Sequence, residues 1–170
     1  EGPLLIVAGA GAGKTKTITH RIVNLIKNGI APDKILAVTF TNKAAKEMLT
    51  RITAMLPINT RGMWVGTFHG LCHRMLRLHH QDAGLVQTFQ ILDSSDQLAL
   101  VKRILKSLSA DDKKFPPRQV QWFINNAKEA GLRAAYVVAD DTFSRRMLEF
   151  YQAYEQQCNK EGAVDFPELL

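Results

Sequence analysis

Gly9-Ala10-Gly11-Ala12-Gly13-Lys14-Thr15 is the stretch of this 170-residue chain that decides its fold. It matches the phosphate-binding pattern G-x-x-x-x-G-K-[ST], with Ala8 at the first position in place of glycine. The apolar run at residues 4–8 predicts a buried parallel strand, and the residues from Lys14 onward predict a helix. Strand, Gly-rich loop and helix in that order form the usual context of this motif. The alternative is a Gly-rich turn that only joins a strand to a helix.

Each residue type in the loop suits the binding of a triphosphate. Small residues let backbone N–H groups approach phosphate oxygens, and a helix N-terminus adds unpaired donors and a favourable dipole. We predict that Lys14 contacts the β- and γ-phosphates of ATP and that the Thr15 hydroxyl binds Mg²⁺, which makes these two the predicted catalytic residues. The predicted nucleotide-binding set comprises Ala8, Gly9, Ala10, Gly11, Ala12, Gly13, Lys14, Thr15, Lys16 and Thr17.

Strands and helices alternate through the first 70 residues. Residues 14–28 predict a helix, with Gly29 as the residue that ends it. Residues 35–40 predict a second strand, residues 43–56 a second amphipathic helix, and residues 63–65 the start of a third strand. This βαβαβ order is typical of an α/β fold built on a parallel sheet.

The remainder of the chain, residues 71–170, has an almost entirely helical pattern. Asp93 is the expected N-cap of one helix, and the pair Pro116-Pro117 and Gly131 are expected to begin and end the next. Residues 142–160 predict a last long helix. We therefore expect an α/β part that ends near residue 70, followed by a mostly helical part.

Composition narrows the class of protein. A hydrophobic content of 46% and a charged content of 22% are ordinary for a globular chain, and no apolar run approaches the roughly 20 residues that span a bilayer. The net charge of +6 suits a polyanionic partner. Cys72 and Cys158 lie far apart and predict free thiols in a reducing cytoplasm. The start at Glu1 lacks a Met and a signal sequence, so we expect the chain to begin inside a longer protein.

A phosphate loop also needs a carboxylate to hold Mg²⁺ and to position the attacking water. Asp140 and Asp141 follow an apolar run, and Asp93 follows a shorter one. Each has a simpler interpretation at the start of a helix. If Asp140 or Asp141 is the catalytic acid, the chain is a self-contained P-loop ATPase or kinase. A further alternative is a basic DNA-binding module with a vestigial loop.

Three segments in a fixed order resemble the first conserved motifs of the UvrD/Rep/PcrA-type superfamily 1 DNA helicases. They are residues 8–15, residues 37–45 (Ala-Val-Thr-Phe-Thr-Asn-Lys-Ala-Ala) and residues 65–70 (Val-Gly-Thr-Phe-His-Gly). Alanine at position 8 is usual in that family. Residues 89–93, 116–118 and 164–170 resemble the UvrD branch most closely, so the resemblance runs the whole length.

The resemblance implies an ATP-dependent 3′-to-5′ DNA helicase that translocates on single-stranded DNA and unwinds duplexes, with a role in DNA repair. It implies that residues 1–70 are the first half of a RecA-like motor domain (1A) and residues 71–170 a helical inserted subdomain (1B). The family's acidic Asp-Glu segment and second motor domain lie outside this chain, so we expect the chain alone to be inactive. The implied cofactors are ATP and Mg²⁺. The implied partners are single-stranded and duplex DNA, the rest of the helicase chain and repair proteins, with a cytoplasmic, nucleoid-associated location and no membrane.

The predicted DNA-binding residues lie in the loops after the second and third strands: Phe40, Thr41, Asn42, Lys43, Thr67, Phe68 and His69. Ligands of open sheets bind at the carboxyl ends of strands, and an aromatic ring there can stack on a base. The alternatives are core positions for the two phenylalanines and a ligand-free helix start for His69. Four further cations are candidate phosphate contacts or solvated charges: Arg74, Arg77, Arg118 and Lys128.

Overall fold

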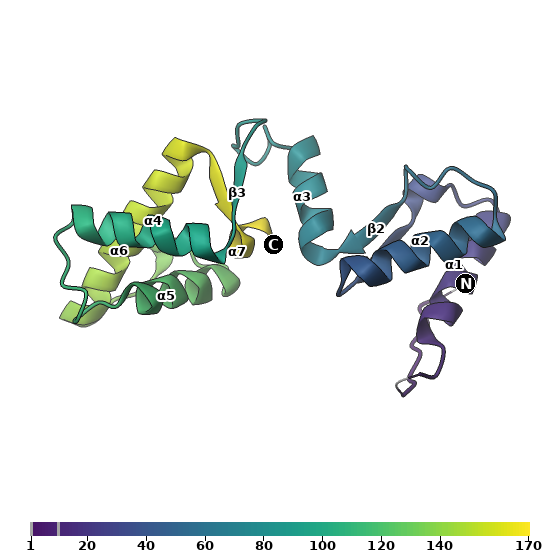
Figure 1. Cartoon of the computed structure of the whole chain (residues 1–170), viewed down its shortest axis with the longest axis horizontal. Helices are drawn as coiled ribbons and strands as arrows, with labels where there is room; N and C mark the ends of the chain where they lie inside the picture. Colours follow the sequence, from purple (N-terminus) through teal and green to yellow (C-terminus); the bar gives the residue numbers. More distant parts are fainter. Residues whose placement is uncertain (1, 10) are drawn as a thin grey trace. The chain divides into compact units, whose positions relative to one another are not determined.

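Residues 2–9 and 11–170 are described by the computed structural model, and the chain divides into two units after Leu71. The second unit runs from Cys72 to Leu170. Helix α3, Phe68–Leu78, contains the division (Figure 1). The mixture of helices with small parallel sheets agrees with the expected α/β class.

The first unit contains two parallel strands joined by a helix. Strand β1 pairs with β2 in parallel, from Leu36 opposite Trp64 to Thr39 opposite Thr67. The elements of this unit are α1 (Lys14–Lys27), a 3-10 turn (Pro32–Lys34), β1 (Leu36–Thr39), α2 (Asn42–Met55) and β2 (Trp64–Thr67). Gly29 has φ of 91° just after α1, as expected of a residue that ends a helix.

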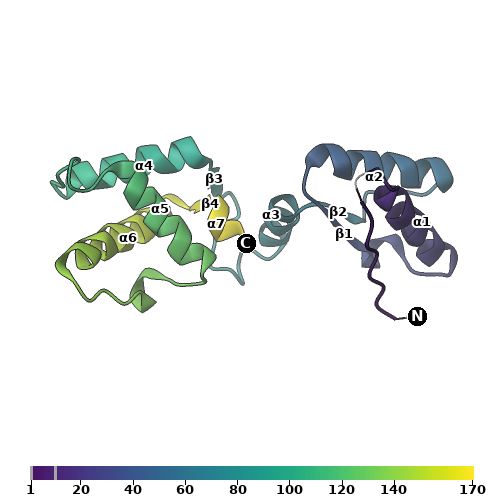
Figure 2. The ribbon, with the colours of Figure 1, turned by 90° about the horizontal axis from the view of Figure 1, so that it is seen from below.

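Helices α1 and α2 pack against each other and against one face of this small sheet (Figure 2). The core consists of Ile22, Val23, Ile35, Ala37, Met48, Ile52 and Met63. Along β1, Ala37 is buried while its neighbours Leu36 and Val38 are exposed. Successive side chains of a strand point to opposite faces, so the second face of β1 is open.

The predicted first strand is wrong. Residues 2–9 form no helix or strand, and the apolar side chains of Leu5 and Val7 are 87% and 89% exposed. An extended segment becomes a strand only when neighbouring strands take its backbone hydrogen bonds and cover its side chains. Strand β1 pairs with β2 instead, and no described strand lies beside residues 4–8.

The second unit packs three long helices around one core. Helices α4, α5 and α6 contact one another pairwise (Figure 2). The largest fully buried side chains on α6 are Phe150, Tyr151 and Tyr154. The elements of the unit are β3 (Gln90–Leu92), α4 (Ser94–Ser107), α5 (Pro117–Glu129), a 3-10 turn (Ala134–Tyr136), α6 (Thr142–Glu161), β4 (Ala163–Asp165) and α7 (Phe166–Leu169).

The expectation of an almost entirely helical second part needs one correction. Strands β3 and β4 form a parallel pair, with Gln90 opposite Ala163 and Leu92 opposite Asp165. Each has only three residues, too few to show a strand periodicity in the sequence. The pair brings Asp165, the last residue of β4, beside helices α4 and α5.

The predicted helix boundaries of this unit are confirmed. Asp93 Oδ1 accepts hydrogen bonds from the backbone of Ser95 and Asp96, each at 2.8 Å. Pro117 is the first residue of α5, and Gly131 follows that helix with φ of 73°.

Cys158 is buried and Cys72 half-buried, both as free thiols, and burial raises the pKa of Cys158 to about 11. No described helix is both long and apolar enough to span a bilayer.

Candidate functional site

The glycine loop before α1 has a backbone that only glycine adopts easily. Gly11 and Gly13 have φ of 76° and 78°, in the left-handed region. Gly13 directly precedes α1, and among the described residues the first N–H that donates along that helix is that of Thr17, to Gly13 O at 3.0 Å. The N–H groups of the first turn therefore lack an intrahelical acceptor and are available to an anion. Ala10, which belongs to the predicted set, lies outside the described residues.

The Lys14 side chain folds back over this loop. Its Nζ donates to the carbonyl oxygens of Ala8 and Gly9, at 2.8 Å in each case. Thr15 is half-buried in the first turn of α1, while Lys16 and Thr17 are exposed. Unpaired N–H donors, an ammonium and a hydroxyl are the groups that a magnesium-bound triphosphate requires, so the residues present fit ATP and Mg²⁺.

Two exposed phenylalanines follow the paired ends of β1 and β2. Thr39 and Thr67 are opposite each other in the last register position, and Phe40 and Phe68 come directly after them. Phe40 is 94% exposed and Phe68 is 55% exposed, so the interpretation of either ring as core is wrong. We call residues 40–43 and 67–69 the strand-end surface.

Both helices that leave the strand-end surface begin at a capping threonine. Thr41 Oγ1 accepts from the N–H of Ala44 at 3.1 Å, and Thr67 Oγ1 accepts from the N–H of Gly70 at 3.2 Å. Asn42 and Lys43 are exposed in the first turn of α2, and His69 is exposed in the first turn of α3. The predicted loop after the third strand does not exist, because β2 ends at Thr67 and α3 begins at Phe68.

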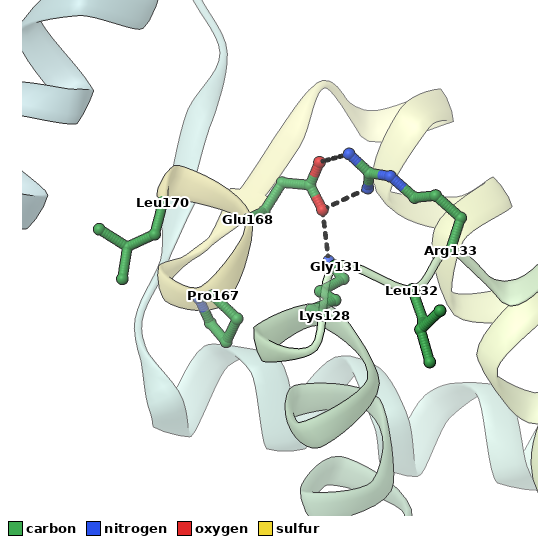
Figure 3. A pocket seen from close by; sticks show the side chains of 7 residues that line it. All are labelled: Lys128, Gly131, Leu132, Arg133, Pro167, Glu168 and Leu170. Atoms are coloured by element: carbon green, nitrogen blue, oxygen red, sulfur yellow. Dashed lines mark hydrogen bonds and ion pairs between the residues drawn. The ribbon is translucent and has the colours of Figure 1, made fainter.

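Lys128, a candidate phosphate contact, is instead part of a buried ion network. Its side chain is 6% exposed, and Nζ lies 2.8 Å from Asp165 Oδ2 and 3.0 Å from Glu168 Oε2. Figure 3 shows the Glu168 carboxylate between Lys128 and Arg133, whose guanidinium binds both oxygens at 2.6 Å. This ammonium is not accessible to a DNA backbone.

Asp165 is the centre of this network. It is 1% exposed and accepts hydrogen bonds from Tyr154 Oη at 2.7 Å and Gln97 Nε2 at 3.3 Å. Burial alone would lower the pKa of Lys128, but the charges of Asp165 and Glu168 outweigh it and raise that pKa. Burial alone would raise the pKa of Glu168, but hydrogen bonds from Arg133 and the charge of Lys128 hold it below its ordinary value.

Arg77 is also structural, and neither interpretation offered for it, a phosphate contact or a solvated charge, describes its contacts. Its guanidinium lies 3.8 Å from the centre of the Phe89 ring and donates to the carbonyls of Gln87 and Phe89 at 2.7 and 2.6 Å. Of the other two candidates, Arg74 is half-buried and Arg118 is exposed on α5. Only Arg118 retains the character of a solvated cation.

The candidate catalytic carboxylates are located at a helix start. Asp141 Oδ1 accepts from the N–H of Ser144 at 2.8 Å and forms a capping box with that serine, which lowers the pKa of Asp141. Asp140 is exposed beside it. Throughout residues 2–9 and 11–170, no three His, Cys, Asp or Glu side chains are grouped so as to hold a metal ion.

Residues 1–170, the whole chain, match the family model of the UvrD/REP helicase N-terminal domain. This chain belongs to the UvrD/Rep helicase family. It is 51% identical to DNA helicase II of Escherichia coli (strain K12), over 98% of this chain and 24% of that protein. It is 44% identical to the ATP-dependent DNA helicase PcrA of Leuconostoc citreum, over all of this chain and 23% of that protein.

The chain thus spans about a quarter of the length of these UvrD/Rep relatives. A third relative, DNA helicase II of Haemophilus influenzae, is 51% identical over 99% of this chain and 24% of its own length. The UvrD/Rep resemblance of residues 8–15, 37–45 and 65–70 is confirmed.

Proposed function

We propose that this chain contributes one half of the ATP site and part of the DNA track of an ATP-dependent helicase. The full-length protein would couple ATP hydrolysis to 3′-to-5′ translocation on single-stranded DNA and to duplex unwinding, in DNA repair. Residues 1–70 would form the first half of its RecA-like motor domain, and residues 71–170 its helical inserted subdomain. The observation that carries the proposal is that the strand-end surface and the glycine loop occur in one unit.

The nucleotide half of the proposal rests on the glycine loop. ATP would supply the phosphoanhydride whose hydrolysis drives movement. The first-turn N–H groups of α1 would bind the phosphate oxygens of ATP. The Lys14 ammonium would give up its hydrogen bonds to the Ala8 and Gly9 carbonyls and bind the β- and γ-phosphates instead. The Thr15 hydroxyl would bind Mg²⁺.

The DNA half rests on Phe40. Phe40 is the most exposed large apolar side chain among the described residues, at 94%, and it lies at the carboxyl end of a strand, where ligands of open sheets bind. A base that stacks on the ring would contribute about 1–3 kcal/mol without regard to sequence. The exposed polar groups of Asn42, Lys43 and His69 would bind the DNA backbone beside it.

The two rival functions lose support. A self-contained ATPase or kinase depends on Asp140 or Asp141. The Asp141 carboxylate already accepts a hydrogen bond from Ser144 at the start of α6, and Asp140 is exposed beside it. Of the cations that a basic DNA-binding module could use in the second unit, Lys128 and Arg77 are bound internally, whereas Arg118 is exposed. Both rivals nevertheless make measurable predictions that differ from those of the helicase.

Substitution of Lys14 in the full-length protein tests the proposal. Lys14→Ala should abolish DNA-stimulated ATP hydrolysis, whereas Lys27→Ala, at the exposed far end of the same helix, should leave it unchanged. Phe40→Ala should weaken binding to single-stranded DNA by roughly 5- to 150-fold, the equivalent of one lost stack. Duplexes with 3′ tails should be unwound and those with 5′ tails should not.

Retained stimulation in Lys14→Ala would reject the nucleotide half of the proposal. Rapid ATP turnover by residues 1–170 alone, lost on Asp140→Asn or Asp141→Asn, would establish the self-contained enzyme instead. DNA binding that is indifferent to both Lys14→Ala and nucleotide would favour the basic module.

A further inference from the structure

Thr39 is the last residue of β1, directly before the exposed Phe40. It is half-buried and lies on the same face of the sheet as Ala37, the face that the helices cover. Thr67 is opposite it on β2. Thr39 is therefore less accessible to a ligand than Phe40, whose side chain is 94% exposed.

The Thr39 hydroxyl connects the two halves of the strand-end surface. Its Oγ1 donates to the carbonyl oxygen of Thr41 at 3.0 Å, across Phe40, and lies 3.5 Å from the carbonyl oxygen of Gly66 on β2. A hydroxyl has a single proton, so the shorter contact is the principal hydrogen bond and the longer one is weak. The first fixes the turn that carries Phe40, and the second holds that turn towards the end of β2.

The backbone decides where an exposed ring leaves the surface, because it fixes the position of Cβ. The Phe40 side chain has almost no packing around it, so only the turn on either side limits where the ring can be. The Thr39 hydroxyl holds one side of that turn, and the Thr41 cap on Ala44 holds the other. A turn that is already held in its binding conformation loses less conformational entropy when its ring binds a base.

We propose that Thr39 is a positioning residue for DNA binding, whose hydroxyl holds the Phe40 turn in its binding conformation while making no contact with DNA. This inference rests on the proposed function, because it assumes that Phe40 binds a base. It gives Thr39 a different role from Thr41 and Thr67, whose hydroxyls accept from the first turns of α2 and α3.

The test uses the full-length protein and a single-stranded oligonucleotide. Thr39→Val keeps the shape and the β-branch but removes the hydroxyl, and it should weaken DNA binding about fivefold, the effect of losing one ordinary hydrogen bond. Thr39→Ser keeps the hydroxyl and should bind within about twofold of the wild type. The KM for ATP without DNA should be unchanged in both variants, because the glycine loop is untouched.

A double-mutant cycle separates positioning from general stabilisation. If Thr39 acts through Phe40, Thr39→Val should have no further effect in a Phe40→Ala background. A residue that only stabilised the first unit would weaken DNA binding equally in both backgrounds. Should Thr39→Val fail to fold, the pair Thr39→Ala and Thr39→Ser replaces it, because these two differ only in the hydroxyl.

Three results would overturn the inference while leaving the proposed function standing: wild-type DNA affinity in Thr39→Val, a Thr39→Ser variant as weak as Thr39→Val, or additive effects in the cycle. Wild-type affinity in Phe40→Ala is a different failure. It would remove the base contact itself, and the inference about Thr39 with it.

Discussion

Replacement of Lys128 by methionine tests the buried ion network of the second unit. Methionine has a similar length and no charge, so the change removes the cation with little change in volume. Asp165 would then keep hydrogen bonds from Tyr154 and Gln97 but lose its ion pair, and Glu168 would keep only Arg133. The variant isolates the cost of a buried carboxylate without its counter-ion.

The expected magnitude follows from the geometry. At 2.8 Å and an effective dielectric constant of about 20, Coulomb attraction between Lys128 and Asp165 is roughly 6 kcal/mol, most of it offset by desolvation of the two ions. Removal of one partner of a buried pair usually costs about 3–5 kcal/mol, because the other charge stays behind. We expect a loss in that range, a large share of the 5–15 kcal/mol typical of a whole domain.

The assay is urea unfolding of residues 1–170, with amide hydrogen exchange of α5 and α6 to report on the second unit alone. Lys102→Met, at an exposed position on α4, is the matched control and should change stability by no more than about 0.5 kcal/mol. A loss below about 1 kcal/mol in Lys128→Met would refute the reasoning. It would mean that water or the remaining hydrogen-bond donors stabilise the Asp165 carboxylate without Lys128.

Three further predictions concern the second unit. Gly162→Ala should lower the free energy of unfolding in urea by about 2 kcal/mol, because φ is 62° and the new Cβ would lie 2.8 Å from Val86. Gly84→Ala is the control, since φ is 67° there but the space is open, and it should cost about half as much. Equal costs in the two variants would contradict a clash with Val86. Ser109→Gly should stabilise by about 0.5–1 kcal/mol, because Ser109 has φ of 51°; a lower thermal midpoint would contradict this. The lowered pKa of Glu168 means that the folded state binds fewer protons than the unfolded state, so the stabilisation from this carboxylate is present above pH 4.5 and lost as the pH falls through the folded pKa. Glu168→Gln should therefore reduce the slope of unfolding free energy against pH in this acidic range. An unchanged slope would contradict the prediction.

Local signals predicted the helices well because helix ends are encoded nearby. Asp93 and Pro117 begin helices in the structure as they do in the sequence pattern, and Gly29 and Gly131 end them. The strand at residues 4–8 failed for a non-local reason. An apolar run indicates that a segment prefers burial. Whether the segment is buried depends on neighbouring strands, which lie elsewhere in the sequence.

The site was predicted unevenly for a similar reason. The strand pattern placed Phe40 and Phe68 correctly at strand ends, and the structure shows both rings exposed there, while their binding to DNA stays a prediction that came from the family resemblance. Lys128 was misjudged as accessible, although a signal was present: it comes four residues after Ile124 and eight after Val120, on the buried stripe of α5. A lysine on such a stripe indicates a buried acidic partner. The partner, Asp165, lies 37 residues further along the sequence, and the β3–β4 pairing brings it close in space.

The open face of β1 has a practical consequence. Among the described residues this sheet has two strands and so an unpaired edge on each side, and the exposed side chains of Leu36 and Val38 lie on β1, the strand that forms one of those edges. Unpaired edges with apolar side chains are templates for strand addition by another molecule. In concentrated solution, self-association of residues 1–170 should therefore start from the first unit, and a charged substitution at Leu36 is the natural gatekeeper against it.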